Sequence, residues 1–333
     1  AAFLRCADGV IGRSAASALY GDTLKNSATR LEKYAACAFA HFMEFGLQIR
    51  ERDQYELKAA DMGTVMHEAL EKFSKKLQEN GETWKTVTDD TRDRLIEECV
   101  EETMADYGNT IFQSSSRNQY RIIRVKRILK RTVWALQQQI RQGEFEPGEF
   151  EVSFSMEDSL SAINIDLSEH EKMRLRGRID RVDLCETDDK VYVKIIDYKT
   201  GNTSLDLVAL YYGLQLQLAV YLDAAVELEQ KKHPGKQVEP AGVFYYHIDD
   251  PMLDQEEDET DEAWGRRMLK ALRMDGLVNA DRKVVELLDR VLEDGTTSDV
   301  QMCAVCGQFR MGQYGRDDGY CMRFVRTCTY QKR

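Results

Sequence analysis

The fold is decided by residues 177–201, which read GRIDRVDLCETDDKVYVKIIDYKTG. Apolar and polar residues alternate over 173–185 and again over 191–199, as they do in β-strands, and the turn-rich segment ETDDK separates the two. This pattern predicts a β-hairpin. Asp197 and Lys199 are two residues apart, so they face the same side of the second strand. Charges at the end of an otherwise apolar face need a partner or a chemical task.

The register of the hairpin supplies a partner. A turn centred between Asp188 and Asp189 places Asp180 opposite Asp197, with their Cβ atoms about 5 Å apart. Two carboxylates that close repel each other unless a cation lies between them, and oxygen ligands suit Mg²⁺. Asp183 is a rival ligand that a regular strand turns to the other face, although a bulge would change that parity. A structural Asp–Lys ion pair accounts for the spacing equally well, so the spacing alone leaves both interpretations open.

Outward from the hairpin, helical and strand patterns follow each other in blocks. Helical periodicity predicts helices over 28–47, 58–80, 83–107, 116–143, 205–230, 262–275 and 282–293. Alternation predicts two more strands, over 149–155 and 241–248. The order predicts an α/β fold, with a small mixed sheet flanked by helices and a helical N-terminal addition. We expect four parts: a lead-in (1–27), a helical part carrying His67 (28–148), a catalytic core (149–298) and a Cys-rich tail without assignable structure (299–333).

The composition fits a globular protein: 43% of the 333 residues are hydrophobic and 31% are charged. No run of about 18 apolar residues and no secretory signal occur, so we expect a cytoplasmic protein without a membrane partner. The chain begins without Met, which suggests a piece of a longer protein. A net charge of −12 argues against nucleic-acid binding. Residues 117–141, however, carry Lys and Arg but no acid, which fits either a DNA-facing surface or a solvated helix face.

Three motifs resemble, in order and spacing, those of the RecB-type PD-(D/E)XK nucleases. They are Gly177-Arg-Ile-Asp180-Arg-Val-Asp183, Asp197-Tyr-Lys199-Thr-Gly201 and Gln217-Leu-Ala-Val-Tyr221. His67, in MGTVMHEALE (62–71), matches the upstream helical histidine of that family. A closer resemblance, over roughly 19–295, is to the C-terminal nuclease domain of the B subunit in AddAB-type helicase–nucleases. Residues 19–57, 211–224 and 242–253 carry it.

The resemblance implies a central sheet between helices and hydrolysis of phosphodiester bonds with Mg²⁺, or with Mn²⁺. By position, Asp180 and Asp197 would hold the metal, with His67 as an additional ligand. Lys199 would orient the attacking water or stabilise charge on the phosphate. Glu151, on the preceding strand, is a further candidate ligand.

Gln217 and Tyr221 lie four residues apart on a helix and so share a face. The resemblance implies that both line the active site. From the residues alone, Tyr221 fits an ordinary core position, and His67, beside Met66 and Leu70, fits the edge of an apolar stripe. The resemblance reverses that interpretation for His67.

The function implied is that of an exonuclease domain in a helicase–nuclease for double-strand break repair and recombination. It would act on single-stranded DNA with the A subunit as its partner. The alternative is a non-catalytic DNA-binding or scaffold module that keeps the nuclease fold. Intact Asp180, Asp197 and Lys199 favour the enzyme.

Cysteines add a second implied cofactor, because B subunits of this type hold a 4Fe–4S cluster through one upstream cysteine and a C-terminal C-x2-C-x5-C. Here the cluster would be held by Cys37, Cys303, Cys306 and either Cys321 or Cys328. Cys37 fits the upstream position, and Cys303 and Cys306 fit the C-x-x-C, but the next cysteine lies too far along the chain to complete the motif. A diverged tail that still binds the cluster and a tail that binds none both remain open.

Overall fold

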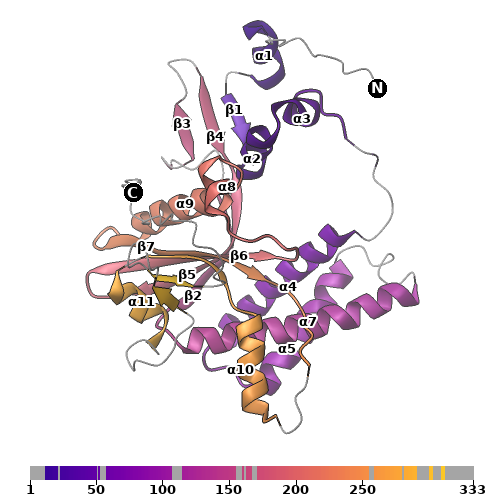
Figure 1. Cartoon of the computed structure of the whole chain (residues 1–333), viewed down its shortest axis with the longest axis vertical. Coiled ribbons are helices and arrows are strands. Elements are labelled where there is room, and N and C mark those ends of the chain that lie inside the picture. Colours follow the sequence, from indigo (N-terminus) through magenta and orange to yellow (C-terminus); the bar gives the residue numbers. More distant parts are fainter. Residues whose placement is uncertain are drawn as a thin grey trace.

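Figure 1 shows the chain as a computed structural model. The structure describes residues 12–21, 23–50, 52, 58–106, 115–154, 160, 163–166, 171–254, 259–279, 281–290, 300–302 and 309–311. Over these ranges, none of the helices combines the length and the hydropathy that a membrane crossing requires.

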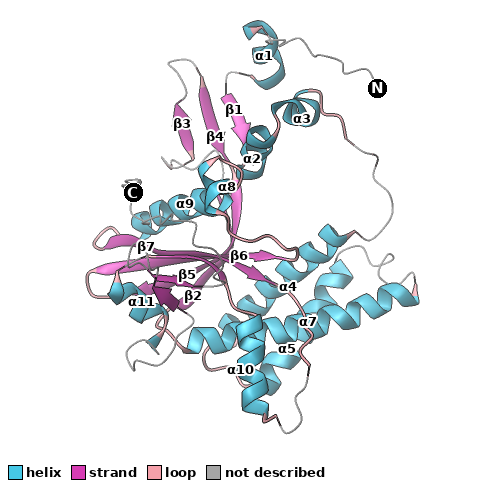
Figure 2. Cartoon of the chain, viewed as in Figure 1, coloured by secondary structure: helices cyan, strands magenta, loops and turns pink. Residues whose placement is uncertain are grey.

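A five-stranded mixed sheet forms the centre, in the order β2-β5-β6-β7-β8. Its strands are β2 (Glu146–Phe154), β5 (Gly177–Glu186), β6 (Lys190–Lys199), β7 (Gln237–His247) and β8 (Asp275–Val278). Only β6 and β7 are parallel to each other, and the other neighbours are antiparallel. Helix α9 (Gln217–Lys232) connects β6 to β7, as a parallel pair requires. The predicted α/β fold with a small mixed sheet is confirmed (Figure 2).

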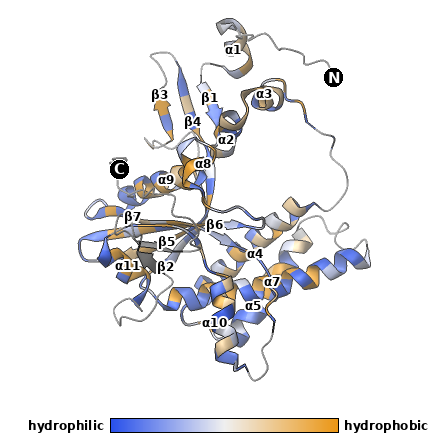
Figure 3. Cartoon of the chain, in the orientation of Figure 1, coloured by the Kyte–Doolittle hydropathy of each residue, from blue (hydrophilic) through white to orange (hydrophobic). Residues whose placement is uncertain are grey.

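Helices cover both faces of this sheet (Figure 1). Helices α4 (Ala59–Glu79), α5 (Asp89–Asp106) and α7 (Ser116–Arg141) share one core with Ile196, Tyr198 and Tyr246 of the strands. Helix α9 packs on the other face, against residues such as Ile195 and Tyr245. Neighbouring strand residues thus enter opposite cores, as strand geometry dictates. Figure 3 shows both hydrophobic and hydrophilic residues along α4, α5 and α7, as expected for helices buried on one side.

The N-terminal part is not purely helical. Between α1 (Arg13–Tyr20) and α2 (Ala28–Ala36) lies β1 (Thr23–Asn26), which pairs with β4 (Lys172–Leu175) in a small sheet completed by β3 (Asn164–Asp166). The helix predicted over 28–47 is interrupted at Cys37, and α3 (Ala38–His41) and a π-helical turn (Phe42–Gly46) follow. The strand predicted over 173–185 is likewise two strands, β4 and β5, because β4 pairs with β1 and β3 in the small sheet whereas β5 pairs with β2 and β6 in the central one.

Two predicted helices after the hairpin are wrong in extent. The helix predicted over 205–230 is divided into α8 (Leu207–Tyr211) and α9, because Gly213 lies at φ +75° and ends the first one. The helix predicted over 262–275 ends early, as α10 (Asp261–Ala271), and strand β8 follows. The remaining elements are α11 (Arg282–Leu288), β9 (Val300–Met302) and β10 (Phe309–Met311).

Candidate active site

The hairpin of β5 and β6 has the predicted register. Arg181 pairs with Ile196, and the ladder runs from there to Glu186 and Val191 at the turn. Continued by one residue, this register places Asp180 across from Asp197. The backbone N–H of Tyr198 donates to Asp180 Oδ2 at 2.7 Å, which fixes one carboxylate oxygen. Both aspartates are buried, Asp197 almost completely.

Three ligand-bearing side chains from three elements meet beside the hairpin. His67 on α4 places its Nδ1 3.4 Å from Asp180 Oδ1 of β5 and 3.9 Å from Glu151 Oε1 of β2. One ligand atom of each residue lies within 4.8 Å of the other two. The His67 ring therefore points toward the acids, although the residue lies at the edge of the apolar face of α4. Glu151 lies in this cluster, and Asp197 lies next to it, paired with Lys199.

Glu151 has an unusual backbone conformation, with φ at +52°. The neighbouring residues Phe150 and Val152 pair regularly with Arg181 and Ile179 of β5. A side-chain-bearing residue in this left-handed region costs roughly 1–3 kcal/mol, and such strain is concentrated at functional sites. The outlier supports a functional role for Glu151, whose carboxylate it holds in the cluster.

Two of the buried acids, Glu151 and Asp197, resist ionisation. Burial, and then the charge of Asp180, raise the pKa of Glu151 to about 7 and the pKa of Asp197 to about 6. Burial opposes protonation of His67, but Asp180, Glu151 and Asp197 outweigh it and raise the pKa of the imidazole. The site thus holds an excess of negative charge away from water, and a bound cation would relieve it.

The donor set fits a divalent cation. Its several carboxylate oxygens suit Mg²⁺ or Mn²⁺, and its one imidazole nitrogen is a ligand more typical of transition-metal ions. Glu151 Oε2 and Asp197 Oδ2 are buried and accept no aligned hydrogen bond from the described residues. Each lies in ion-pair range of one cation, Arg178 Nε at 2.6 Å and Lys199 Nζ at 2.5 Å respectively. These two carboxylate oxygens can therefore still coordinate a metal ion.

Lys199 is held by a chain of polar contacts. Its Nζ lies 2.5 Å from Asp197 Oδ2 and donates to Gln217 Oε1 at 2.9 Å. Gln217 in turn donates from Nε2 to the hydroxyl of Tyr221, at 3.3 Å. The predicted shared face of Gln217 and Tyr221 therefore points at Lys199. The same ammonium lies 5.2 Å from the ring centre of Tyr245.

Asp183 lies outside this cluster, on the other side of the hairpin. Arg181 donates to its carboxylate from Nε and Nη2, at 2.5 and 2.9 Å, and Lys194 Nζ lies 2.8 Å away. Asp183 and Arg181 have no exposed surface. Two cations already neutralise this carboxylate, so it is a structural residue rather than a metal ligand.

Three residues around the site, Arg178, Tyr198 and Glu32, were not among the predicted ones. Arg178 pairs with Glu151, and its place two residues before Asp180 was a usable signal, because strand alternation puts both on one face. Tyr198 holds Asp180 through its backbone, and its ring packs edge-on against His67, with the centroids 5.7 Å apart. Glu32 Oε1 accepts from the N–H groups of Leu216 and Gln217, a long-range cap that no local pattern reveals.

The cysteine and basic-helix predictions have different outcomes. Cys37 is exposed, whereas Cys303, Cys306, Cys321 and Cys328 lie outside the described residues, so the iron–sulfur cluster stays a prediction.

On the basic helix α7, Arg127 and Arg131 pair with Asp250, and Lys126 and Lys130 pair with acids of α5. The middle of this helix is thus neutralised by the protein itself, which is not the open basic face considered for DNA.

This fold and these side chains define a class. A mixed sheet between helices carries paired acids and a lysine on one hairpin, with a histidine and a glutamate brought in from neighbouring elements. Residues 25–310 match the family model of the PD-(D/E)XK nuclease superfamily, and the chain belongs to that superfamily.

Among curated proteins, the chain is similar to one component of a larger enzyme. It is 49% identical over 277 residues to the B subunit of the ATP-dependent helicase/deoxyribonuclease of Lachnoclostridium phytofermentans, covering 83% of this chain and 23% of that protein. The B subunit of the same name from Alkaliphilus metalliredigens is 41% identical over 288 residues, covering 86% of this chain and 25% of that protein. The chain therefore spans about a quarter of the length of these relatives. A solved structure of a candidate exonuclease from Eubacterium rectale aligns over 86% of this chain and 85% of its own, with a TM-score of 0.33 and 10% identity, too little to bear on the argument.

Proposed function

We propose that this chain is a Mg²⁺-dependent DNA exonuclease domain that hydrolyses phosphodiester bonds of single-stranded DNA. The observation that carries the proposal is the cluster of His67, Glu151 and Asp180, whose ligand atoms lie within 4.8 Å of one another beside Asp197 and Lys199. Crowded buried acids next to a lysine suit a reaction in which negative charge develops on a phosphate.

Each side chain has a role in this proposal. His67, Glu151, Asp180 and Asp197 would hold Mg²⁺, or Mn²⁺ in its place. When bound, the metal supplies a lowered pKa for a coordinated water and polarisation of the phosphate. Lys199 stabilises negative charge on the scissile phosphate or orients the attacking water.

Gln217 and Tyr221 act through Lys199. Their hydrogen bonds hold the ammonium beside Asp197 and limit its other rotamers. The side chain of Lys199 is 22% exposed, so it can contact a substrate, whereas its counterion Asp197 stays buried. This arrangement preorganises the charge before the substrate binds.

The setting is proposed from the names of the relatives. We infer that the domain is the C-terminal part of the B subunit of a helicase–nuclease for double-strand break repair and recombination, with the A subunit as partner, in the cytoplasm. The helical part (28–148) would carry His67 to the core (149–298). The identities of 49% and 41% over most of this chain support this setting.

The test compares Asp197→Ala with Asp189→Ala, the same substitution at the exposed hairpin turn. End-labelled single-stranded DNA is incubated with each protein in Mg²⁺, Mn²⁺ or EDTA. We expect Asp197→Ala to lose at least about 100-fold in rate, since even outer partners of metal ligands cost 10–100-fold, and to keep DNA binding. Asp189→Ala should cleave like the wild type. Wild-type protein that binds DNA but never cleaves it would instead support the non-catalytic DNA-binding or scaffold module.

A further inference from the structure

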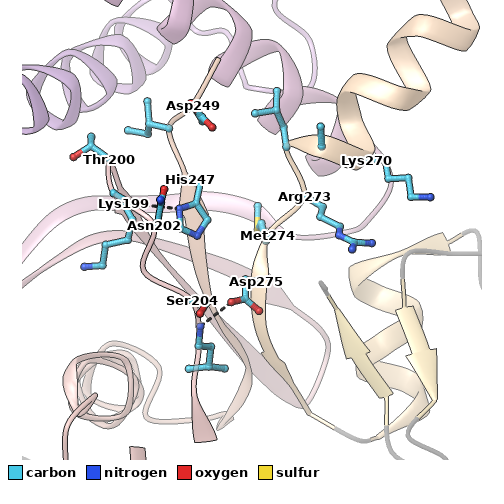
Figure 4. Close-up of a pocket in the computed structure, with 15 residues that line it drawn as sticks. Lys199, Thr200, Asn202, Ser204, His247, Asp249, Lys270, Arg273, Met274 and Asp275 are labelled. Carbon is cyan, nitrogen blue, oxygen red and sulfur yellow. Dashed lines mark hydrogen bonds between the residues drawn. The ribbon is translucent and has the colours of Figure 1, made fainter. Parts of the chain in front are cut away.

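A hollow of about 680 Å³ opens next to Lys199, where the chain leaves the sheet (Figure 4). Three segments line it: the loop after β6 (200–205), the residues at the end of β7 (247–249) and the stretch from α10 into β8 (270–275). Because β6 and β7 are parallel, their carboxyl ends meet at this edge, where α/β sheets commonly bind ligands. The volume lies within the range of ligand sites.

The lining is polar and rich in hydrogen-bond donors. Thr200, Asn202 and Ser204 supply hydroxyl and amide groups. His247 donates from Nδ1 to the carbonyl of Gly201 at 2.8 Å, which fixes the ring at the wall. Neutral donors of this kind are typical contacts to phosphate oxygens.

Two cations of the hollow are uncommitted. Lys270, exposed, and Arg273, half-buried, have no carboxylate partner among the residues that the structure describes. Figure 4 shows them on one side of the hollow and Lys199 on the other. The lining also holds two acids, Asp249 and Asp275, whose carboxylates each accept one backbone hydrogen bond at 2.7 Å, from Asp250 and Leu205 respectively. The three cations of the lining, Lys199, Lys270 and Arg273, outnumber them.

The hollow continues into a second one. A smaller space of about 320 Å³ shares Thr200, Ile248 and Asp249 with it and is lined on its far side by Lys58, Arg121 and Arg124. Arg124 is exposed and has no carboxylate partner in the described chain, unlike the neutralised middle of α7. The cations therefore follow a path from the start of α7, past the end of β6, to the end of α10.

We propose that this path binds the phosphodiester backbone of the strand whose reacting phosphate lies at Lys199, with Lys270 and Arg273 contacting phosphates on one side of it. The inference deepens the proposed nuclease function and rests on it. It places the DNA strand along the carboxyl ends of β6 and β7.

The test reverses the charges of the hollow as Lys270→Glu/Arg273→Glu. The control is Lys283→Glu/Arg290→Glu, which makes the same two changes of charge elsewhere. Lys283 and Arg290 line another hollow, of about 580 Å³, together with Lys190 and Glu144. Affinity for a fluorescent single-stranded oligonucleotide is measured in EDTA over a series of salt concentrations. We expect Lys270→Glu/Arg273→Glu to weaken binding at least about tenfold and to lower the salt slope by about 1.4, the value for two phosphate contacts on a single strand.

Two further measurements make the result decisive. The Mg²⁺-induced rise in Tm should be the same in both double variants, which shows that the metal cluster is intact. Glutamine at both positions should give a smaller loss of affinity with a similar change in slope. If the control variant loses as much affinity as Lys270→Glu/Arg273→Glu, the loss reflects net charge alone and the proposal is overturned. Unchanged DNA binding in Lys270→Glu/Arg273→Glu would overturn it as well, and so would a wild-type protein that does not bind single-stranded DNA. Because binding is read without metal, absence of Mg²⁺-dependent cleavage would count against the proposed function alone.

Discussion

Replacing Asp183 by asparagine removes the only negative charge from the buried group that it forms with Arg181 and Lys194. Burial alone would raise the pKa of this carboxyl, but Arg181 and Lys194 together lower it, so the group is ionised at neutral pH. The same substitution at Asp197 acts on the metal cluster instead. Two chemically identical changes in one hairpin should therefore have different consequences.

The magnitude follows from burial. Removing one partner of a buried ion pair costs about 3–5 kcal/mol, because the other charge is left without compensation. Asp183→Asn leaves Arg181, with 0% of its surface exposed, and Lys194, with 7%, without their counterion. Burial already lowers the pKa of Lys194, so the lysine can lose its proton while Arg181 stays charged, and we expect a loss within this range. That is a large share of a domain stability of about 5–15 kcal/mol.

Asp197→Asn should behave differently in the metal-free protein. Burial and Asp180 raise the pKa of Asp197 to about 6, so above that pH its charge opposes folding. Asparagine removes this repulsion but also the counterion of Lys199, which is 22% exposed and can turn to water. We expect a change in stability well below that of Asp183→Asn, with the Mg²⁺-induced stabilisation lost.

The assay is urea unfolding at pH 7.5, in EDTA and in Mg²⁺. If Asp183→Asn folds too poorly to measure, Lys194→Met takes its place, since it keeps the pair of Arg181 and Asp183 and should cost less. An Asp183→Asn protein that is stable within about 1 kcal/mol of wild type but no longer responds to Mg²⁺ would refute the reasoning. Asp183 would then be the metal ligand and the buried group irrelevant.

Three further expectations concern the same site. Glu151→Gly should stabilise the metal-free protein by about 1 kcal/mol, because glycine tolerates the positive φ, and should weaken Mg²⁺ binding in calorimetry by tenfold or more; a loss of stability would contradict the strain. Tyr198→Phe removes the hydroxyl that Arg181 contacts and should cost about 0.5–1.5 kcal/mol with Mg²⁺ affinity kept, since the backbone holds Asp180. Mg²⁺ at 100 times its Kd should stabilise the wild type by about 2.7 kcal/mol over EDTA, and no rise in Tm would exclude a metal site.

The hairpin was predictable because its information is local. Alternation over two short runs and one turn centre fix the register, and the pairing of Arg181 with Ile196 agrees with it. The strand β8 was not predictable in the same way. Its four residues, Asp275–Val278, begin with Asp-Gly, a pair more typical of turns than of strands, and only the partner strand β7 selects an extended conformation.

Roles within the hairpin depend on what lies above and below it. In the sequence, nothing distinguishes Arg181 and Asp183 from the other charged residues of the strand. In the structure, the ring centres of Trp84 and Phe150 lie 4.9 and 5.8 Å from the Arg181 guanidinium and cover it. Those rings come from segments far away in sequence. A charged pair is buried there because its partners are brought in by the fold, which no single-strand pattern can show.

The place of Glu151 depends on one irregularity in β2. Before Gly148, Pro147 pairs with Asp183; after it, Glu149 pairs with Val182, so the register has moved by one residue. Had the first register continued, Phe150 would lie across from Asp180 and Glu151 would lie one step away. The shift instead places Glu151 across from Asp180, within reach of His67. A Pro-Gly pair inside a strand is a known mark of a bulge, so the sequence held the signal, but its effect is defined only by the partner strand β5.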